Sequence, residues 1–249
     1  MMLTDKRQRI GITEAGEIAF NLFAFDHLYD GNIIITKRLT DKLIDKLIEH
    51  KDKIILHLTC TGYGSSVLEP FVPTVEQTHI KFLQLIEKGF PISHVVLRID
   101  PCIPTEKGKR TMMNVIETFK DDKITRVRFS ILDMYKHVKE RFTDKGLPIP
   151  YETFHAPLKD RMEIYDILKQ YADKFDFDVE VCGEPGIESI SCLSQKDIDI
   201  LGLTNKIILV GNKEQRNSCH CPANKTELLK VKPHQCNNQC LYCFWKNEN

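Results

Sequence analysis

The feature that most constrains the fold is an alternation of short β-branched runs with longer amphipathic segments. The β-branched runs predict strands over residues 9–13, 32–37, 54–60, 94–100, 124–130, 177–183 and 206–210. Apolar residues at helical spacing predict helices over residues 40–51, 74–89, 109–120, 132–142 and 158–175. Strand and helix in alternation imply parallel strands joined by crossover helices.

Seven strands before residue 211 predict an α/β fold, either a complete or a partial TIM-like (β/α) barrel. An open, doubly wound sheet is the alternative. In both folds ligands lie at the carboxyl ends of the strands. Because the alternation stops after Val210, we expect residues 1–210 to form the barrel. Residues 211–249 are then a cysteine-rich tail of the same structural domain, lying over the barrel mouth.

Composition narrows the classes of function. Lys plus Arg and Asp plus Glu both number 35, so there is no basic excess of the kind that a non-specific nucleic-acid binder carries. The first residues contain no apolar core of a signal peptide, and the chain has no run of about 18 apolar residues, so we expect a cytoplasmic protein. Nine cysteines in such a chain favour metal or redox chemistry over a disulfide framework.

Five of the nine cysteines lie in the last 31 residues, and Cys236, Cys240 and Cys243 stand at C-x3-C-x2-C spacing. Structural zinc sites take four ligands, typically as two separated pairs. Iron–sulfur clusters accept staggered sets of thiolates, and three thiolates leave one iron of a [4Fe–4S] cluster open to a small molecule. The spacing favours a cluster, and a zinc-stabilised barrel is the alternative.

The terminal motif, with Tyr242 directly before its third cysteine, resembles the cluster motif of the radical S-adenosylmethionine superfamily. In that superfamily the motif usually follows the first strand of a partial barrel, whereas here it follows the last predicted strand. The chain is similar to a family of uncharacterised bacterial proteins, distantly akin to spore photoproduct lyase, whose cluster motif is C-terminal. The stretches that carry the similarity are "HLTCTGYGSSVLEP" (57–70), "VVLRIDPC" (95–102), "RVRFSILDMYKHVKERF" (126–142), "VCGEPG" (181–186) and "QRNSCHC" (215–221).

The resemblance implies that Cys236, Cys240 and Cys243 each ligate one iron and that S-adenosylmethionine binds the fourth. Reductive cleavage would then yield a 5′-deoxyadenosyl radical that abstracts a substrate hydrogen, with a flavodoxin or ferredoxin as electron donor. Kinship with spore photoproduct lyase suggests a nucleic-acid substrate by analogy alone. Cys219 and Cys221 leave three possibilities open: a fourth ligand that makes a non-catalytic iron–sulfur protein, a second metal site, or thiols that merely lie near the cluster.

Polar residues at the predicted strand ends are the other candidates for the site. Carboxylates suit the amino and hydroxyl groups of the cofactor, and an arginine suits its carboxylate. Asp100 is a candidate catalytic residue, and so is Cys60, either as a hydrogen-atom donor or, on the simpler interpretation, as a buried apolar residue. Arg98 and Asp100 could equally pair with each other. If the barrel closes, the tail lies beside the first strand, and Glu14 or Glu17 could then be the cofactor-binding glutamate next to the cluster. The predicted cofactor-binding residues are Glu14, Thr36, Lys37, Thr59, Arg98 and Glu184.

Overall fold

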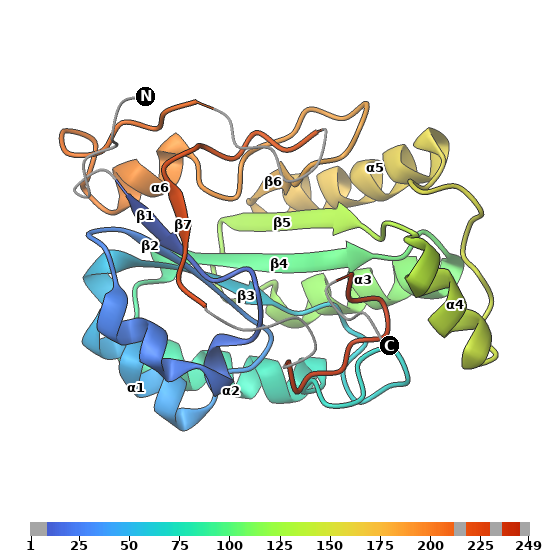
Figure 1. Cartoon of the computed structure of the whole chain (residues 1–249), viewed down its shortest axis with the longest axis horizontal. Coiled ribbons are helices and arrows are strands. Elements are labelled where there is room, and N and C mark those ends of the chain that lie inside the picture. The colour runs from blue at the N-terminus through green and yellow to red at the C-terminus, as the bar shows by residue number, and fades with distance from the viewer. Residues whose placement is uncertain (1–8, 212–217, 230–235, 245–249) are drawn as a thin grey trace.

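The computed structural model describes residues 9–211, 218–229 and 236–244 (Figure 1). It has an α/β fold built on one all-parallel sheet of seven strands in the order β6-β5-β4-β3-β2-β1-β7. The strands are β1 (Ile10–Ile12), β2 (Asn32–Thr36), β3 (Ile54–Thr59), β4 (Val95–Cys102), β5 (Arg126–Ile131), β6 (Asp178–Val181) and β7 (Lys225–Glu227).

Six α-helices accompany the sheet in the described ranges, together with short 3-10 segments at Ile18–Phe20, Leu22–His27, Lys51–Lys53 and Ile92–His94. None of the helices in these ranges is long and apolar enough to cross a membrane. Thr40 caps the first helix as predicted, because its hydroxyl accepts a hydrogen bond from Leu43 N at 3.2 Å. The helices are α1 (Asp41–Glu49), α2 (Val75–Glu87), α3 (Glu106–Phe119), α4 (Lys136–Asp144), α5 (Leu158–Phe175) and α6 (Gln195–Ile200).

The first six predicted strands and all five predicted helices are confirmed, but the predicted strand over 206–210 is wrong. The seventh strand is β7, which lies in the segment predicted as an irregular tail and pairs with β1. Ala223 N donates to Val210 O at 2.8 Å, and the Asn224 side chain donates to Ile208 O at 3.0 Å. Residues 206–210 therefore bond the chain that leads into β7 and take no place in the sheet.

The two faces of the sheet differ in chemistry, because side chains alternate along each strand. In β5, Val127, Phe129 and Ile131 belong to the large apolar cluster that includes residues from α1 to α5. The intervening residues Arg126 and Arg128 are fully buried on the opposite face. That second face, which we call the inner face, also carries a smaller apolar cluster with residues from β1, α6 and the cysteine-bearing segment before β7.

A buried charge network holds β5, β6 and α6 together on the inner face. Arg126 Nε lies 2.6 Å from Glu180 Oε1, and Arg126 Nη1 lies 2.8 Å from Asp197 Oδ1. Arg128 pairs with the other oxygen of Glu180 and donates to Ile190 O at 3.0 Å. Burial alone would raise the pKa of Glu180, but the charges of Arg128 and Arg126 outweigh it and hold the pKa below its ordinary value.

We expect Arg126→Gln to lower the free energy of unfolding by about 3–5 kcal/mol, because it leaves two buried carboxylates without their shared cation. Urea unfolding at pH 7 measures the loss. The matched control is Lys88→Gln, whose partner Asp45 is exposed and whose loss should stay below about 1 kcal/mol. Equal losses in the two variants would contradict the assigned role of the buried network.

The contribution of Glu180 to stability should depend on pH in a defined direction. Its folded pKa lies below the ordinary value of 4.5, so its stabilising effect is complete above pH 4.5 and is lost as the pH falls through the folded pKa. The difference in unfolding free energy between the wild type and Arg126→Gln should therefore shrink in acid. Urea titrations from pH 7 down to acid pH test this, and a difference that grows in acid would refute it.

Candidate functional site

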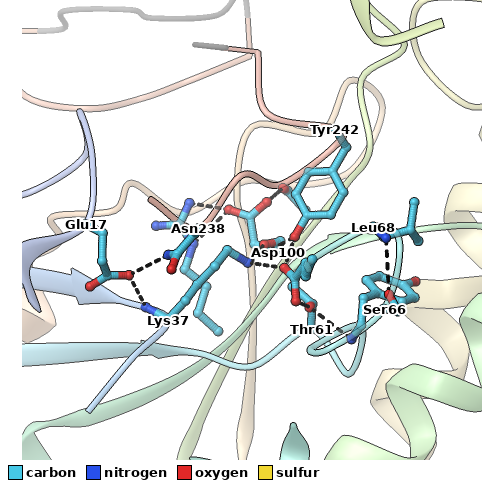
Figure 2. Close-up of polar contacts among 12 residues, drawn as sticks. Glu17, Lys37, Thr61, Ser66, Leu68, Asp100, Asn238 and Tyr242 are labelled. Carbon is cyan, nitrogen blue, oxygen red and sulfur yellow. Dashed lines mark hydrogen bonds and ion pairs between the residues drawn. The ribbon is translucent and has the colours of Figure 1, made fainter. Parts of the chain in front are cut away.

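The terminal loop, residues 236–244, lies against the carboxyl ends of the central strands (Figures 1 and 2). The hydroxyl of Tyr242 donates to Glu69 and accepts from Lys37 Nζ at 3.1 Å. Leu241 N donates to Leu68 O at 2.9 Å, so the backbone of the loop is also joined to the turn that follows β3. Side-chain and backbone bonds together place the three terminal cysteines at the edge of the sheet where parallel α/β folds bind ligands.

Arg141, on α4, holds the other side of the terminal loop. Its side chain is buried and donates to Leu241 O at 2.7 Å and to Cys243 O at 3.0 Å. A guanidinium fork can satisfy two carbonyl groups at once, which a lysine cannot do with the same geometry. The loop is therefore held both by the β3 turn and by α4.

Glu69 is the centre of the polar contacts beneath the loop. Its side chain is fully buried, and its carboxylate lies 2.7 Å from Lys37 Nζ and accepts from the Thr61 hydroxyl at 2.7 Å. Burial alone would lower the pKa of Lys37, but Glu69 and then Cys240 outweigh it and hold the pKa above its usual value. Lys37 therefore stays charged beside one of the three terminal cysteines.

Glu17 supports the loop from the side of β1 and β2. Its carboxylate accepts from Asn238 Nδ2 at 3.0 Å and from Lys37 N at 2.9 Å (Figure 2). It also accepts from the Thr36 hydroxyl. The side chain is buried, and this burial raises the pKa of Glu17. Glu17, one of the two glutamates expected beside the terminal motif, thus lies beneath the terminal loop, with several of its oxygen lone pairs already occupied by hydrogen bonds.

The three terminal thiols are grouped on this loop. Burial raises the pKa of Cys240 to about 12 and also raises that of Cys236, and the charges of Cys236, Cys240 and Cys243 act on one another. Within the described ranges, no three His, Cys, Asp or Glu side chains already stand as a group that could hold a metal ion. The donor chemistry nevertheless fits an iron–sulfur cluster, since three thiols lie on one short loop beside a lysine cation.

Arg98 and Asp100 occupy the end of β4 and pair with each other, as one of the two interpretations expected. Arg98 Nε donates to Asp100 Oδ2 at 2.7 Å, and the Ser130 hydroxyl donates to the other carboxylate oxygen. Lys37 Nζ donates to Asp100 O at 3.4 Å, which links this pair to the terminal loop. The neighbouring Thr59 hydroxyl is buried and has no hydrogen-bond partner among the described residues.

Two predicted site residues, Glu14 and Glu184, lie away from this group, whereas Cys60 lies near it, where the charges of Glu69 and Lys37 act on its thiol. Glu14 Oε2 lies 2.7 Å from Lys225 Nζ on β7, and Glu184 accepts from Ile131 N at 2.7 Å beside β6. The thiol of Cys60 bonds the Thr78 side chain of α2, on the helix-covered side, and burial raises its pKa to about 12. The packing of Cys60 matches a buried apolar residue, and its role as hydrogen-atom donor remains a prediction.

In the folded chain, Cys219 and Cys221 lie close to two further cysteines, Cys182 and Cys192. Cys221 bonds both Cys192 and Cys219, and Cys192 Sγ lies 3.4 Å from Cys182 Sγ. These contacts join the C-x-C segment to the region after β6. The spacing of the C-x-C pair gave no sign of its partners, because Cys182 and Cys192 are far away in sequence.

Three residues of the site, Glu69, Asn238 and Arg141, were not indicated by the sequence. Glu69 lies in a turn two residues after the exposed Val67 and directly before Pro70, a context typical of a surface carboxylate. Its one distinguishing signal is that it is the acidic residue in the stretch from His57 to Pro70 that carries the family resemblance. Its burial follows from the closure of the terminal loop over it.

Tyr242→Phe should loosen the terminal loop, because it removes the hydroxyl shared by Lys37 and Glu69. The net contribution of such hydrogen bonds, about 0.5–1.5 kcal/mol, corresponds to a roughly two- to tenfold faster alkylation of Cys240 in metal-free protein. Mass-spectrometric peptide mapping measures the labelling rate. Tyr171→Phe, which removes a hydroxyl bonded to Glu117 on the helical side, is the matched control and should leave the rate unchanged. An unaltered rate in Tyr242→Phe would contradict this anchoring.

Comparison with known proteins bears on the same residues. No curated protein matches the chain. A family described as "Domain of unknown function (DUF1848)" matches residues 30–245, a range that runs from just before β2 to the end of the terminal cysteine motif. This range contains the Lys37–Glu69–Tyr242 contacts and all three terminal cysteines. The chain belongs to the DUF1848 family.

Proposed function

We propose that this protein binds a [4Fe–4S] cluster through Cys236, Cys240 and Cys243 and acts as a radical S-adenosylmethionine-type enzyme. The observation that carries the proposal is the attachment of the terminal loop to the carboxyl ends of the strands by Tyr242, Glu69 and Lys37. A partial (β/α) barrel is the form of the parallel sheet that suits this activity, because its strand ends surround one pocket.

The terminal loop carries three thiols, which supports a cluster with one iron left open to a small-molecule ligand. Cys219 and Cys221, the two cysteines that could have supplied a fourth ligand, bond each other and Cys192. A cluster held by three thiolates keeps one iron for a small-molecule ligand. A fully ligated, non-catalytic iron–sulfur protein and a zinc-stabilised barrel are the competing functions.

When bound, the cluster and S-adenosylmethionine would supply an electron and a 5′-deoxyadenosyl group for hydrogen abstraction. The protein's own part is to hold and orient them. Lys37 places a positive charge beside Cys240, which offsets the negative charge of thiolate ligands in a buried position. Tyr242 and Arg141 keep the loop in place, and the aromatic ring of Tyr242 excludes water beneath it.

The candidate cofactor-binding residues narrow to those at the ends of β2, β3 and β4. Lys37 or Arg98 suits the carboxylate of S-adenosylmethionine, and Asp100 suits its amino group. Thr36 already bonds Glu17, so the hydroxyl of Thr59 is the better candidate for a ligand hydrogen bond. Glu14 and Glu184 are not part of this set, because they bond Lys225 and the end of β5.

Anaerobically purified and reconstituted protein should contain the four irons of one cluster per chain. Cys240→Ser should lose this iron, because one of three ligands is removed. Cys102→Ser is the matched control, since Cys102 is also buried but belongs to neither group of cysteines. Iron analysis by mass spectrometry makes the comparison.

Electron paramagnetic resonance then tests the open iron. Adding S-adenosylmethionine to the reduced protein should change the spectrum of the cluster. An unchanged spectrum with iron present would favour the fully ligated protein, and zinc in place of iron on the terminal loop would favour the zinc-stabilised barrel. Either result overturns the proposed activity.

A further inference from the structure

Four cysteines that are distant in sequence meet on the inner face of the sheet. Cys182 directly follows β6, Cys192 lies in the next loop, and Cys219 and Cys221 lie shortly before β7. Cys182 Sγ is 3.4 Å from Cys192 Sγ, Cys221 bonds Cys192, and Cys219 bonds Cys221. All four side chains are buried. We call this group the inner cysteine cluster.

We propose that the inner cysteine cluster binds a single zinc ion, at a site separate from the terminal loop. Four cysteine sulfurs are the ligand set of closed structural zinc sites. Zinc–sulfur bonds of about 2.3 Å in a tetrahedron put neighbouring sulfurs about 3.8 Å apart, close to the 3.4 Å between Cys182 and Cys192. A [4Fe–4S] cluster suits this spacing less well, because each of its thiolates binds a different iron and the sulfurs lie farther apart.

The arrangement of the thiols needs a small adjustment to accept the ion. Cys182 Sγ and Cys192 Sγ are 3.4 Å apart, and the four thiols, like the other described residues, do not yet have the geometry of a metal site. The required change is a separation of a few tenths of an ångström, from 3.4 Å toward about 3.8 Å, which side-chain rotation can provide. Cys192 and Cys219 lie outside the helices and strands, where the backbone can follow.

The charges around the cluster suit a zinc tetrathiolate. Four thiolates and one Zn²⁺ carry a net charge of two negatives, which needs nearby cations when it is buried. The guanidinium groups of Arg98 and Arg128 act on Cys182 and Cys192, and the ammonium group of Lys225 acts on Cys221. Glu14, the carboxylate that acts on Cys192, has Lys225 Nζ 2.7 Å away.

The position of the proposed zinc site, between the two edges of the sheet, indicates a structural role. β6 and β7 are the two edge strands of the sheet, and the inner cysteine cluster joins the residue after β6 to the segment before β7. The Ser218 hydroxyl already donates to Gly183 O at 2.5 Å across the same junction. A zinc ion with four protein ligands has no open position for catalysis, so its effect is to hold the two edges of the sheet together.

Metal analysis of the full-length protein tests the site. We expect one zinc per chain to survive dialysis, and we expect its loss in Cys192→Ser and in Cys221→Ser but not in Cys102→Ser. Cys240→Ser should keep the zinc even where it loses iron, so a failure of the proposed cluster and a failure of the zinc site are distinguishable. Wild-type protein without zinc, or zinc lost in Cys240→Ser, would overturn the proposal.

Cobalt substitution provides a readout in which all four members of the inner cysteine cluster are kept. In Cys240→Ser protein with an intact inner cysteine cluster, Co²⁺ should give the strong sulfur-to-cobalt charge-transfer absorption and the d–d bands of a tetrahedral tetrathiolate. Zinc should displace the cobalt and abolish these bands. A spectrum typical of octahedral cobalt with oxygen ligands, or iron–sulfur absorption that survives Cys240→Ser, would refute a single zinc at this position.

Discussion

The buried carboxylate of Glu69 is the group on which the arrangement of the candidate site depends. It binds Thr61 of its own turn, Lys37 at the end of β2 and Tyr242 of the terminal loop, so three distant parts of the chain meet at one side chain. A buried carboxylate is stable only when cations and hydrogen-bond donors surround it. Closing the loop supplies one of those donors, and the loop carries the three terminal cysteines.

The inner face of the sheet also holds buried charges that are stable only because opposite charges lie beside them. Arg126 and Arg128 are fully buried there and are balanced by Glu180 and Asp197, so the strands carry charge where a simple core would carry aliphatic residues. Such a face is costly in desolvation, and its stability depends on every buried charge having an opposite charge beside it.

The cysteines divide into two groups of different character. The terminal group lies on one loop of nine residues, and its members are close because they are close in sequence. The inner cysteine cluster is assembled from three segments between residues 182 and 221, and it brings the two edge strands together. A short loop suits a cluster presented to a ligand, whereas four thiols that join distant segments suit a structural tie.

Local pattern alone determined six of the strands, the five longest helices, the cap at Thr40 and the terminal cysteine motif, because each depends on residues near one another in sequence. Of the two glutamates after the first strand that were expected beside the terminal motif, tertiary structure placed Glu17 beneath the terminal loop and Glu14 beside Lys225. Tertiary structure decided that residues 225–227, and not 206–210, pair with β1, since a short apolar run does not reveal its partner. It also decided the burial of Glu69 and the meeting of Cys182 with Cys192 and Cys221, because long-range contacts depend on how distant segments pack and leave no periodic trace in the chain.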